Sequence, residues 1–237
     1  MNTETEEEIA VEDMEIQIIS VENYAEELKD LGILKGTDKG LELDSELTRV
    51  QAMLVYFRLL GINPEKLEDF VNSTVLYKIC PFEDVPSWAW DEISYLYNLG
   101  LIKGISKTKL GSEDKMTVEQ FVTLILRALD YYDNNGDFIW NESLEKAMEI
   151  GLLPSDKVEY FKASDTFTRG DMSYITYNAL RINLKNQNKT LLEVRDLSEE
   201  TMEPLLDDEV INIKTEKVLE EIEQQIEDDF EVVDVHL

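Results

Sequence analysis

The chain has 237 residues and a 43% hydrophobic content, which is enough for a packed core. Its 52 acidic and 22 basic residues give a formal net charge of -30, which argues against nucleic acid or an anionic membrane as a partner. One cysteine, Cys80, and one histidine, His236, exclude an internal disulfide, a cysteine- or histidine-based metal site and a histidine-based catalytic triad. No apolar run approaches the roughly 20 residues of a membrane-spanning helix, so membrane insertion is not expected.

The N-terminal segment, residues 1–20, is mostly acidic and polar, and we expect it to be flexible. It lacks the basic and apolar regions of a signal peptide. Two interpretations fit that absence: a cytoplasmic protein, or an exported protein whose signal peptide has been removed.

Three segments of the chain share one pattern, an apolar-periodic stretch that ends at a glycine. The glycines are Gly32, Gly100 and Gly151, and apolar residues precede each of them at intervals of three, as on one face of a helix. Two further apolar residues follow each glycine, which can adopt the left-handed conformation that ends a helix. The pattern predicts three short helices that stop at these glycines. Their matched apolar residues are Ala25, Leu28 and Leu31, then Ile93, Leu96 and Leu99, then Leu144, Ala147 and Ile150.

A threonine follows each glycine after 16 or 17 residues. Three residues beyond each threonine stands a glutamine or an aspartate, at the start of an apolar run. This arrangement is typical of a capping box, which starts a helix. We therefore expect each unit to consist of a helix, a glycine stop, a polar loop and a second, capped helix. The three pairs are Thr48 and Gln51, Thr117 and Gln120, and Thr168 and Asp171.

These units predict an all-α fold built from three helix-loop-helix repeats. Residues 64–81 are predicted to form a connecting helix that begins near Pro64. Residues 217–226 have the apolar spacing of a short amphipathic helix. The predicted repeats span residues 21–63, 82–132 and 133–185, and an acidic C-terminal segment spans residues 186–237.

Motifs in all three repeats resemble the S-layer homology family. The second repeat contains Phe82-Glu83-Asp84-Val85-Pro86 followed by Trp88-Ala89, and its glycine stop is Gly100-Leu101-Ile102-Lys103-Gly104. The first contains Thr48-Arg49-Val50-Gln51 and the third contains Phe167-Thr168-Arg169-Gly170-Asp171. The resemblance covers residues 24–181. One such motif would be weak evidence for the family, but three motifs in order at matched spacing are specific to it.

This resemblance implies a monomer in which three repeats form a pseudo-threefold helical prism. It also implies an extracellular location at the cell wall, with the signal peptide removed. The family anchors proteins non-covalently by binding acidic secondary cell-wall polysaccharide, typically through sugars that carry pyruvate ketals, in grooves between repeats.

In the family the arginine of the Thr-Arg motif is the expected ligand contact, and by position these arginines are Arg49 and Arg169. The second repeat has Val118 at this place, and Pro154-Ser155 replace Lys-Gly after the third glycine. The groove centred on the second repeat is therefore expected to be altered, or to depend on other groups.

Physical chemistry gives a separate reason to single out the two arginines. A helix N-terminus carries about half a positive charge, so a cation in its first turn is unfavourable by a few tenths of a kcal/mol. A local rule that is broken twice at matched positions favours a binding site, and free amides beside a guanidinium suit a carboxylate. The candidate polysaccharide-binding residues are Arg49, Arg169, Thr48, Gln51, Thr117, Gln120, Thr168, Trp90 and Lys103.

Other aromatic and basic residues have ordinary explanations. We expect Trp88 and Trp140 to be core residues, whereas Trp90 fits a core position and a sugar contact equally well. Lys35 and Lys103, just after the glycine stops, could line a groove, but a surface position is the simpler interpretation.

Two further groups of polar residues have structural explanations. Arg58 and Arg127 fit a structural pair with nearby carboxylates as well as they fit a binding contact. Residues 133–136 with Glu142 mimic part of a calcium loop, but Tyr131 stands where the first acidic ligand must be. We therefore expect this stretch to link two repeats and to bind no metal.

Three functions from different classes fit the sequence. A carbohydrate-binding anchor is favoured by the motifs. A protein-interaction module that keeps the fold without a sugar site fits the altered second repeat and the acidic ends, and a calcium-dependent structural protein of the cell surface is the third. The carboxylates are spread over the chain without a distinct acid/base pair, so we expect neither enzymatic activity nor a cofactor.

Overall fold

The structure is a computed structural model that describes residues 20–62, 67–68 and 80–195. Within these residues every regular element is a helix, and β-bridges occur only as isolated pairs. The predicted all-α fold class is therefore confirmed. The predicted flexible N-terminus, nearly all of the predicted connecting helix and the predicted helix at residues 217–226 lie outside the described residues.

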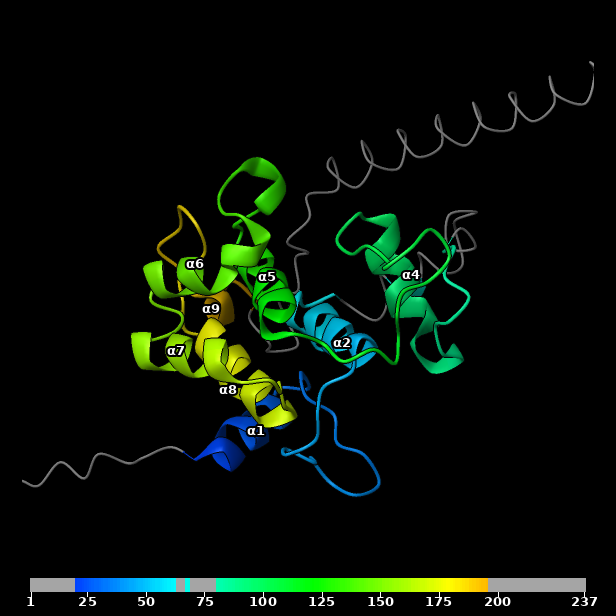
Figure 1. Ribbon diagram of the computed structural model, residues 1–237, viewed down its shortest axis with the longest axis horizontal. Helices are drawn as coiled ribbons and strands as arrows, with labels where there is room; N and C mark the ends of the chain where they lie inside the picture. Colours follow the sequence, from blue (N-terminus) through cyan, green and yellow to red (C-terminus); the bar gives the residue numbers. More distant parts are fainter. Residues whose placement is uncertain (1–19, 63–66, 69–79, 196–237) are drawn as a thin grey trace, which may run out of the picture.

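Short helices joined by structured loops make up the described part of the chain (Figure 1). None of these helices is long and apolar enough to cross a bilayer. The α-helices are α1 (Val21–Asp30), α2 (Arg49–Leu59), α4 (Trp90–Asn98), α5 (Val118–Ala128), α6 (Ser143–Glu149), α7 (Ser155–Ala163), α8 (Arg169–Ala179) and α9 (Leu191–Arg195), and the 3₁₀ turns are η2 (Ser87–Ala89), η3 (Asp133–Asn135) and η4 (Trp140–Glu142).

Capping boxes start α2, α5 and α8, as the sequence predicts. In α2 the Thr48 hydroxyl accepts a hydrogen bond from the Gln51 amide, and the Gln51 side chain accepts one from the Thr48 amide at 3.3 Å. The same reciprocal pair forms at the other two threonines. Each cap satisfies amides that have no partner inside the helix and contributes about 1 kcal/mol.

Glycine stops end α1, α4 and α6, also as predicted. Gly32, Gly100 and Gly151 have φ values of 70°, 67° and 77°, in the left-handed region. At the end of α1 the Ile33 amide donates to the Leu28 carbonyl at 2.9 Å, and the same bond closes the other two helices. These are Schellman motifs, in which the residue after the glycine folds back over the last helical turn.

The first helix of each predicted repeat packs against the second helix of a different predicted repeat. Helix α4 packs on α2, α6 packs on α5, and α1 packs on α8, while α5 also contacts both α2 and α8 (Figure 1). Helix α1 of the first predicted repeat therefore lies beside α8 of the third. The complete threefold prism stays a prediction.

The third predicted repeat departs from the others after its glycine stop. We expect a polar loop there, and this prediction is wrong because residues 155–163 form α7. The cause is visible in the sequence: Pro154 stands at the N-terminus, and Val158 and Phe161 lie one helical turn apart. Both side chains are buried, so α7 adds a small apolar face to the core.

Candidate functional site

The start of α2 binds the loop that precedes α5, and we name this contact the Arg49 junction. The Arg49 amide donates to the Asp114 carbonyl at 2.8 Å, and the Val50 amide donates to the Ser112 carbonyl at 3.1 Å. The start of α8 binds the loop that precedes α2 in the same way, and we name this contact the Arg169 junction. There the amides of residues 169 and 170 donate to the carbonyls of residues 45 and 43 at 2.9 and 2.8 Å.

These bonds correct one expectation about the helix N-termini. The sequence suggests free amides that would join the arginine in an anion site. In the structure the first amides of α2 and α8 are occupied by loop carbonyls and by the capping side chains. Any anion site at these positions must therefore depend on side chains.

The Arg169 guanidinium is sealed inside its junction. Its Nε donates to the Leu41 carbonyl at 2.8 Å and its Nη2 donates to the Lys35 carbonyl at 2.9 Å. The residue is only 5% exposed. Burial lowers the pKa of Arg169, and the charge of Glu42 partly opposes this effect. Because Nε and Nη2 both donate to backbone carbonyls of the first predicted repeat, this arginine holds two repeats together.

The Arg49 guanidinium is bonded less completely. Its Nη2 donates to the Lys103 carbonyl at 2.9 Å, which matches the bond from Arg169 to Lys35. Its Nη1 reaches the Gln120 side-chain oxygen only at 3.5 Å, and its Nε is buried without a hydrogen-bond partner. Burial lowers the pKa of Arg49, and the charge of Asp114 opposes that shift. Leaving a buried donor unpaired costs about 1–3 kcal/mol. Because this Nε is shielded from solvent, an acceptor that enters from outside would meet Nη1, whose own bond is long.

A hollow of about 220 Å³ lies beside the Arg49 guanidinium. Its walls are partly cationic and partly apolar, and they come from segments of all three predicted repeats. The lining residues are Arg49, Met53, Ile102, Lys103, Met116, Gln120, Thr123, Leu124, Arg127, Asp133 and Trp140.

An ion pair forms part of this wall. Arg127 binds the Asp133 carboxylate at two points, from Nε at 2.8 Å and from Nη2 at 2.9 Å, and it also donates to the Leu101 carbonyl at 3.1 Å. The hydrogen bond from Arg127 lowers the pKa of Asp133. This confirms the predicted structural pairing of Arg127, and it means that the Asp133 carboxylate already has a cationic partner. Within the described residues no group of three or more candidate ligands could hold a metal ion.

The nine candidate residues from the sequence separate into two groups. Arg49, Lys103 and Gln120 come together at the hollow. The others do not line it: the threonines and Gln51 serve as caps, Arg169 is sealed, and Trp90 is half-buried against the core. The candidates outside this hollow are Thr48, Gln51, Thr117, Thr168, Arg169 and Trp90.

The prediction that Trp88 and Trp140 are core residues is wrong. They are 61% and 57% exposed. Trp140 lies four residues before the buried Leu144, a spacing that would place both on one helical face. Residues 140–142 form the 3₁₀ turn η4 instead, so the phase of α6 does not extend back to the tryptophan. The helical spacing therefore gave no indication that Trp140 lines the hollow.

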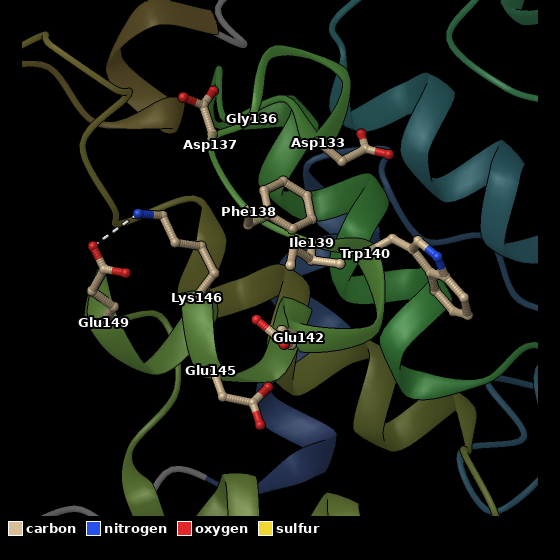
Figure 2. A pocket seen from close by; sticks show the side chains of 10 residues that line it. All are labelled: Asp133, Gly136, Asp137, Phe138, Ile139, Trp140, Glu142, Glu145, Lys146 and Glu149. Atoms are coloured by element: carbon tan, nitrogen blue, oxygen red, sulfur yellow. Dashed lines mark hydrogen bonds and ion pairs between the residues drawn. The ribbon is translucent and has the colours of Figure 1, made fainter.

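A second hollow, of about 480 Å³, adjoins the first and shares Asp133 and Trp140 with it (Figure 2). Several of its carboxylates are paired, as Glu149 is with Lys146 at 2.8 Å. In Figure 2 the Trp140 ring and the Asp133 carboxylate point to the same side, away from Lys146 and Glu149. This orientation turns Trp140 toward the Arg49 hollow. The second hollow is lined by Asp133, Gly136, Asp137, Phe138, Ile139, Trp140, Glu142, Glu145, Lys146 and Glu149.

The start of α5 forms no junction of this type in the described part of the chain. Val118 replaces the arginine, and the amides of residues 118 and 119 make no such bonds to the loop that precedes α8. That loop contains α7, which begins after Pro154. The missing arginine at Val118 and the additional helix α7 thus lie at the same interface. A hollow of about 240 Å³ is found there, and its lining includes Val118 of α5 and Phe161 of α7.

Comparison with known protein families identifies the class of domain. Residues 81–122, which include α4, the glycine stop at Gly100 and the first part of α5, match the model of the S-layer homology domain. This segment of the chain is therefore similar to the S-layer homology domain.

Individual relatives resemble a larger part of the chain. It is 29% identical over 155 residues to a cell surface protein of Thermoanaerobacter kivui and 26% identical over 188 residues to a middle cell wall protein of Brevibacillus brevis. It is also 25% identical over 162 residues to an endoglucanase of a Bacillus species. The matches cover 64%, 77% and 62% of this chain. They cover only 19%, 17% and 16% of the relatives, so the chain spans less than a fifth of their length.

Proposed function

We propose that the chain is a non-catalytic module that anchors protein to the bacterial cell wall by binding an acidic wall polysaccharide at the Arg49 junction. The match of residues 81–122 to the S-layer homology domain, together with relatives named as a cell surface protein and a middle cell wall protein, supports a location at the cell surface. The endoglucanase match covers 16% of that enzyme and is compatible with a shared non-catalytic part.

The position of the Arg49 guanidinium at a hollow carries this proposal. It lies beside Lys103 and Gln120, and its Nη1 has only a contact at the 3.5 Å limit, which an acceptor on a ligand would replace. A carboxylate is the acceptor that best matches the planar guanidinium, and each charge-assisted hydrogen bond is worth about 1.5–3 kcal/mol. The pyruvate ketal of a wall polysaccharide, which the family resemblance implies, supplies such a carboxylate on a sugar.

The net charge of the chain opposes the approach of an acidic polymer at long range. With a formal charge of -30, the chain and the polymer repel each other beyond the immediate contact. Salt screens this repulsion over about 10 Å at 0.1 M, while the contact to a half-buried arginine is screened less. We therefore expect moderate salt to leave binding unchanged or to improve it.

Calorimetric titration with native wall polysaccharide, beside the same polymer stripped of its pyruvate ketals, tests the proposal. The native polymer should bind with one site per chain and the stripped polymer should not. Arg49→Gln should weaken binding at least tenfold, which corresponds to about 1.4 kcal/mol. Arg181→Gln, which removes an exposed arginine paired with Glu27, is the matched control and should bind like the wild type. Wild-type affinity in Arg49→Gln would reject the site.

The same titration separates this proposal from a protein-interaction function. The sealed Arg169 junction and the missing junction at α5 leave one of three predicted grooves open, which is what partial loss of sugar binding would look like. If neither polymer binds to the wild-type chain, the anchoring proposal fails and the interaction module becomes the better explanation of the retained fold.

A further inference from the structure

We propose that Trp140 is the platform on which a sugar ring of the bound polysaccharide stacks, opposite the Arg49 guanidinium. This inference rests on the proposed function and adds to it a second recognition element. Arg49 would bind the acid group of the ligand, while Trp140 would recognise the apolar face of the ring that carries it or of the neighbouring ring.

The backbone around Trp140 packs against α5 although the residue is exposed. The Ser143 hydroxyl, just after η4, donates to the Glu119 carbonyl of α5 at 3.0 Å. The Trp140 carbonyl lies 3.5 Å from the Thr123 hydroxyl, whose shorter bond, at 2.8 Å, is to the Glu119 carbonyl. The ring itself is 57% exposed, so the chain presents a large, ordered aromatic surface to solvent. A rigid aromatic face of this kind loses little conformational entropy when a ligand packs on it.

The chemistry of the hollow suits a sugar with an acidic substituent. Trp140, Met53 and Met116 give it apolar surface, while Arg49 and Lys103 give it cationic surface. A pyranose ring has the same two-sided character, with an apolar C–H face and polar groups at its edge. Aromatic side chains pack against apolar faces and keep polar groups free for hydrogen bonding. The hollow therefore matches an acidic sugar better than a free anion, which would use the arginine alone.

The other two tryptophans do not share this arrangement. Trp88 is as exposed as Trp140 but lines none of the three hollows described above, and Trp90 is packed partly against the core. The chain has three tryptophans in total, and all three are described. Trp88 thus provides a control of the same residue type, and a variant that keeps only Trp140 provides a specific fluorescent reporter.

Two measurements on the full chain test the inference. In the Trp88→Phe, Trp90→Phe variant, native polysaccharide should shift the emission of Trp140 and reduce its quenching by acrylamide, and the ketal-stripped polymer should do neither. In calorimetry, Trp140→Ala should weaken binding about tenfold, a loss in the range of aromatic stacking contacts. Trp140→Phe should recover most of the affinity, and Trp88→Ala should bind like the wild type.

The outcomes distinguish this inference from the function on which it rests. If Arg49→Gln loses binding while Trp140→Ala keeps it and the emission of Trp140 does not change, the stacking role is rejected and the anchoring function stands. If the wild-type chain binds neither polymer, the anchoring function fails first. Because Trp140 is exposed, Trp140→Ala should unfold at the same urea concentration as the wild type, which confirms that any loss is local.

Discussion

The Arg49 and Arg169 junctions begin from the same Thr-Arg motif and end in different environments. In both, the threonine caps a helix, and the next two amides donate to carbonyls of a neighbouring loop. In both, the arginine Nη2 donates to the carbonyl of a lysine just after a glycine stop. The junctions differ at Nε, which is bonded in Arg169 and unpaired in Arg49.

The loop that faces each arginine explains this difference. In the Arg169 junction the Leu41 carbonyl accepts the Nε hydrogen bond. Counted from the glycine stop, Lys109 is the matching residue in the Arg49 junction, but its carbonyl accepts from the Ser106 amide at 3.2 Å within its own loop. A Thr-Arg motif therefore marks a junction between repeats, and the surrounding carbonyls decide which nitrogens of its arginine are bonded within the protein.

Truncating the two arginines should give the largest contrast between the junctions. Arg169→Ala should lower the free energy of unfolding by about 3 kcal/mol, because it removes a buried side chain, opens a cavity and leaves two carbonyls without their donors. Arg49→Ala should cost about 1 kcal/mol, because its bonding is already incomplete. Urea unfolding followed by circular dichroism measures both values. Equal losses would show that the two arginines have the same structural role and would remove the basis of the comparison.

Asp84 offers a way to loosen the Arg49 junction alone. Its carboxylate accepts hydrogen bonds from the amides of Leu110, Gly111 and Ser112 at 2.7, 2.8 and 3.1 Å. Burial acts to raise the pKa of Asp84, but these amides outweigh it and lower the pKa. Because the Ser112 carbonyl is in turn the acceptor for Val50, Asp84→Asn should disturb the loop on which α2 rests.

We expect Asp84→Asn to lower the free energy of unfolding by about 2 kcal/mol and to weaken polysaccharide binding several-fold. Asp38→Asn, at an exposed position in the loop of the first predicted repeat, is the matched control and should change neither quantity. Unchanged binding in a destabilised Asp84→Asn variant would indicate that the loop does not shape the site.

The Asp133–Arg127 ion pair, which lines the hollow beside Arg49, should make the free energy of unfolding depend on pH. The pKa of Asp133 is lowered in the folded state, so its ionised form stabilises the fold above the unfolded pKa of about 3.9. That contribution is lost as the pH falls through the lower, folded pKa. Asp133→Asn should therefore cost about 1 kcal/mol at pH 7 and less as the pH falls below about 3.9.

In the first predicted repeat, Arg58 occupies the position that Arg127 has in the second, ten residues after the capping threonine. Arg58 donates to the Ile33 carbonyl at 3.4 Å. Glu92, whose charge acts on Arg58, provides the control. Glu92→Gln should give a smaller and less pH-dependent change in unfolding free energy. A cost for Asp133→Asn that stays constant from pH 7 to pH 2 would contradict a contribution from the ionised carboxylate.

The parts of the fold that were predictable from the sequence depend on neighbouring residues. Thr117 and Gln120 stand three residues apart and form a capping box wherever a helix begins between them. Gly100 adopts a positive φ because no side chain opposes it, and the residues around it close the helix. The helix α7 could have been found by the same reasoning, from Pro154 and the spacing of Val158 and Phe161.

The candidate site was less predictable, because its residues are distant in sequence. Arg49 reaches a carbonyl 54 residues away, and Arg169 reaches one 128 residues away. The sequence alone determined where helices start and stop, since those interactions lie within one or two turns. Tertiary packing decided that first helices pair with second helices of other repeats, that Arg169 is sealed and Arg49 is open, and that Trp140 faces solvent. The physical reason is that burial and hydrogen bonding of a side chain depend on which distant backbone surrounds it, and no local pattern specifies that neighbour.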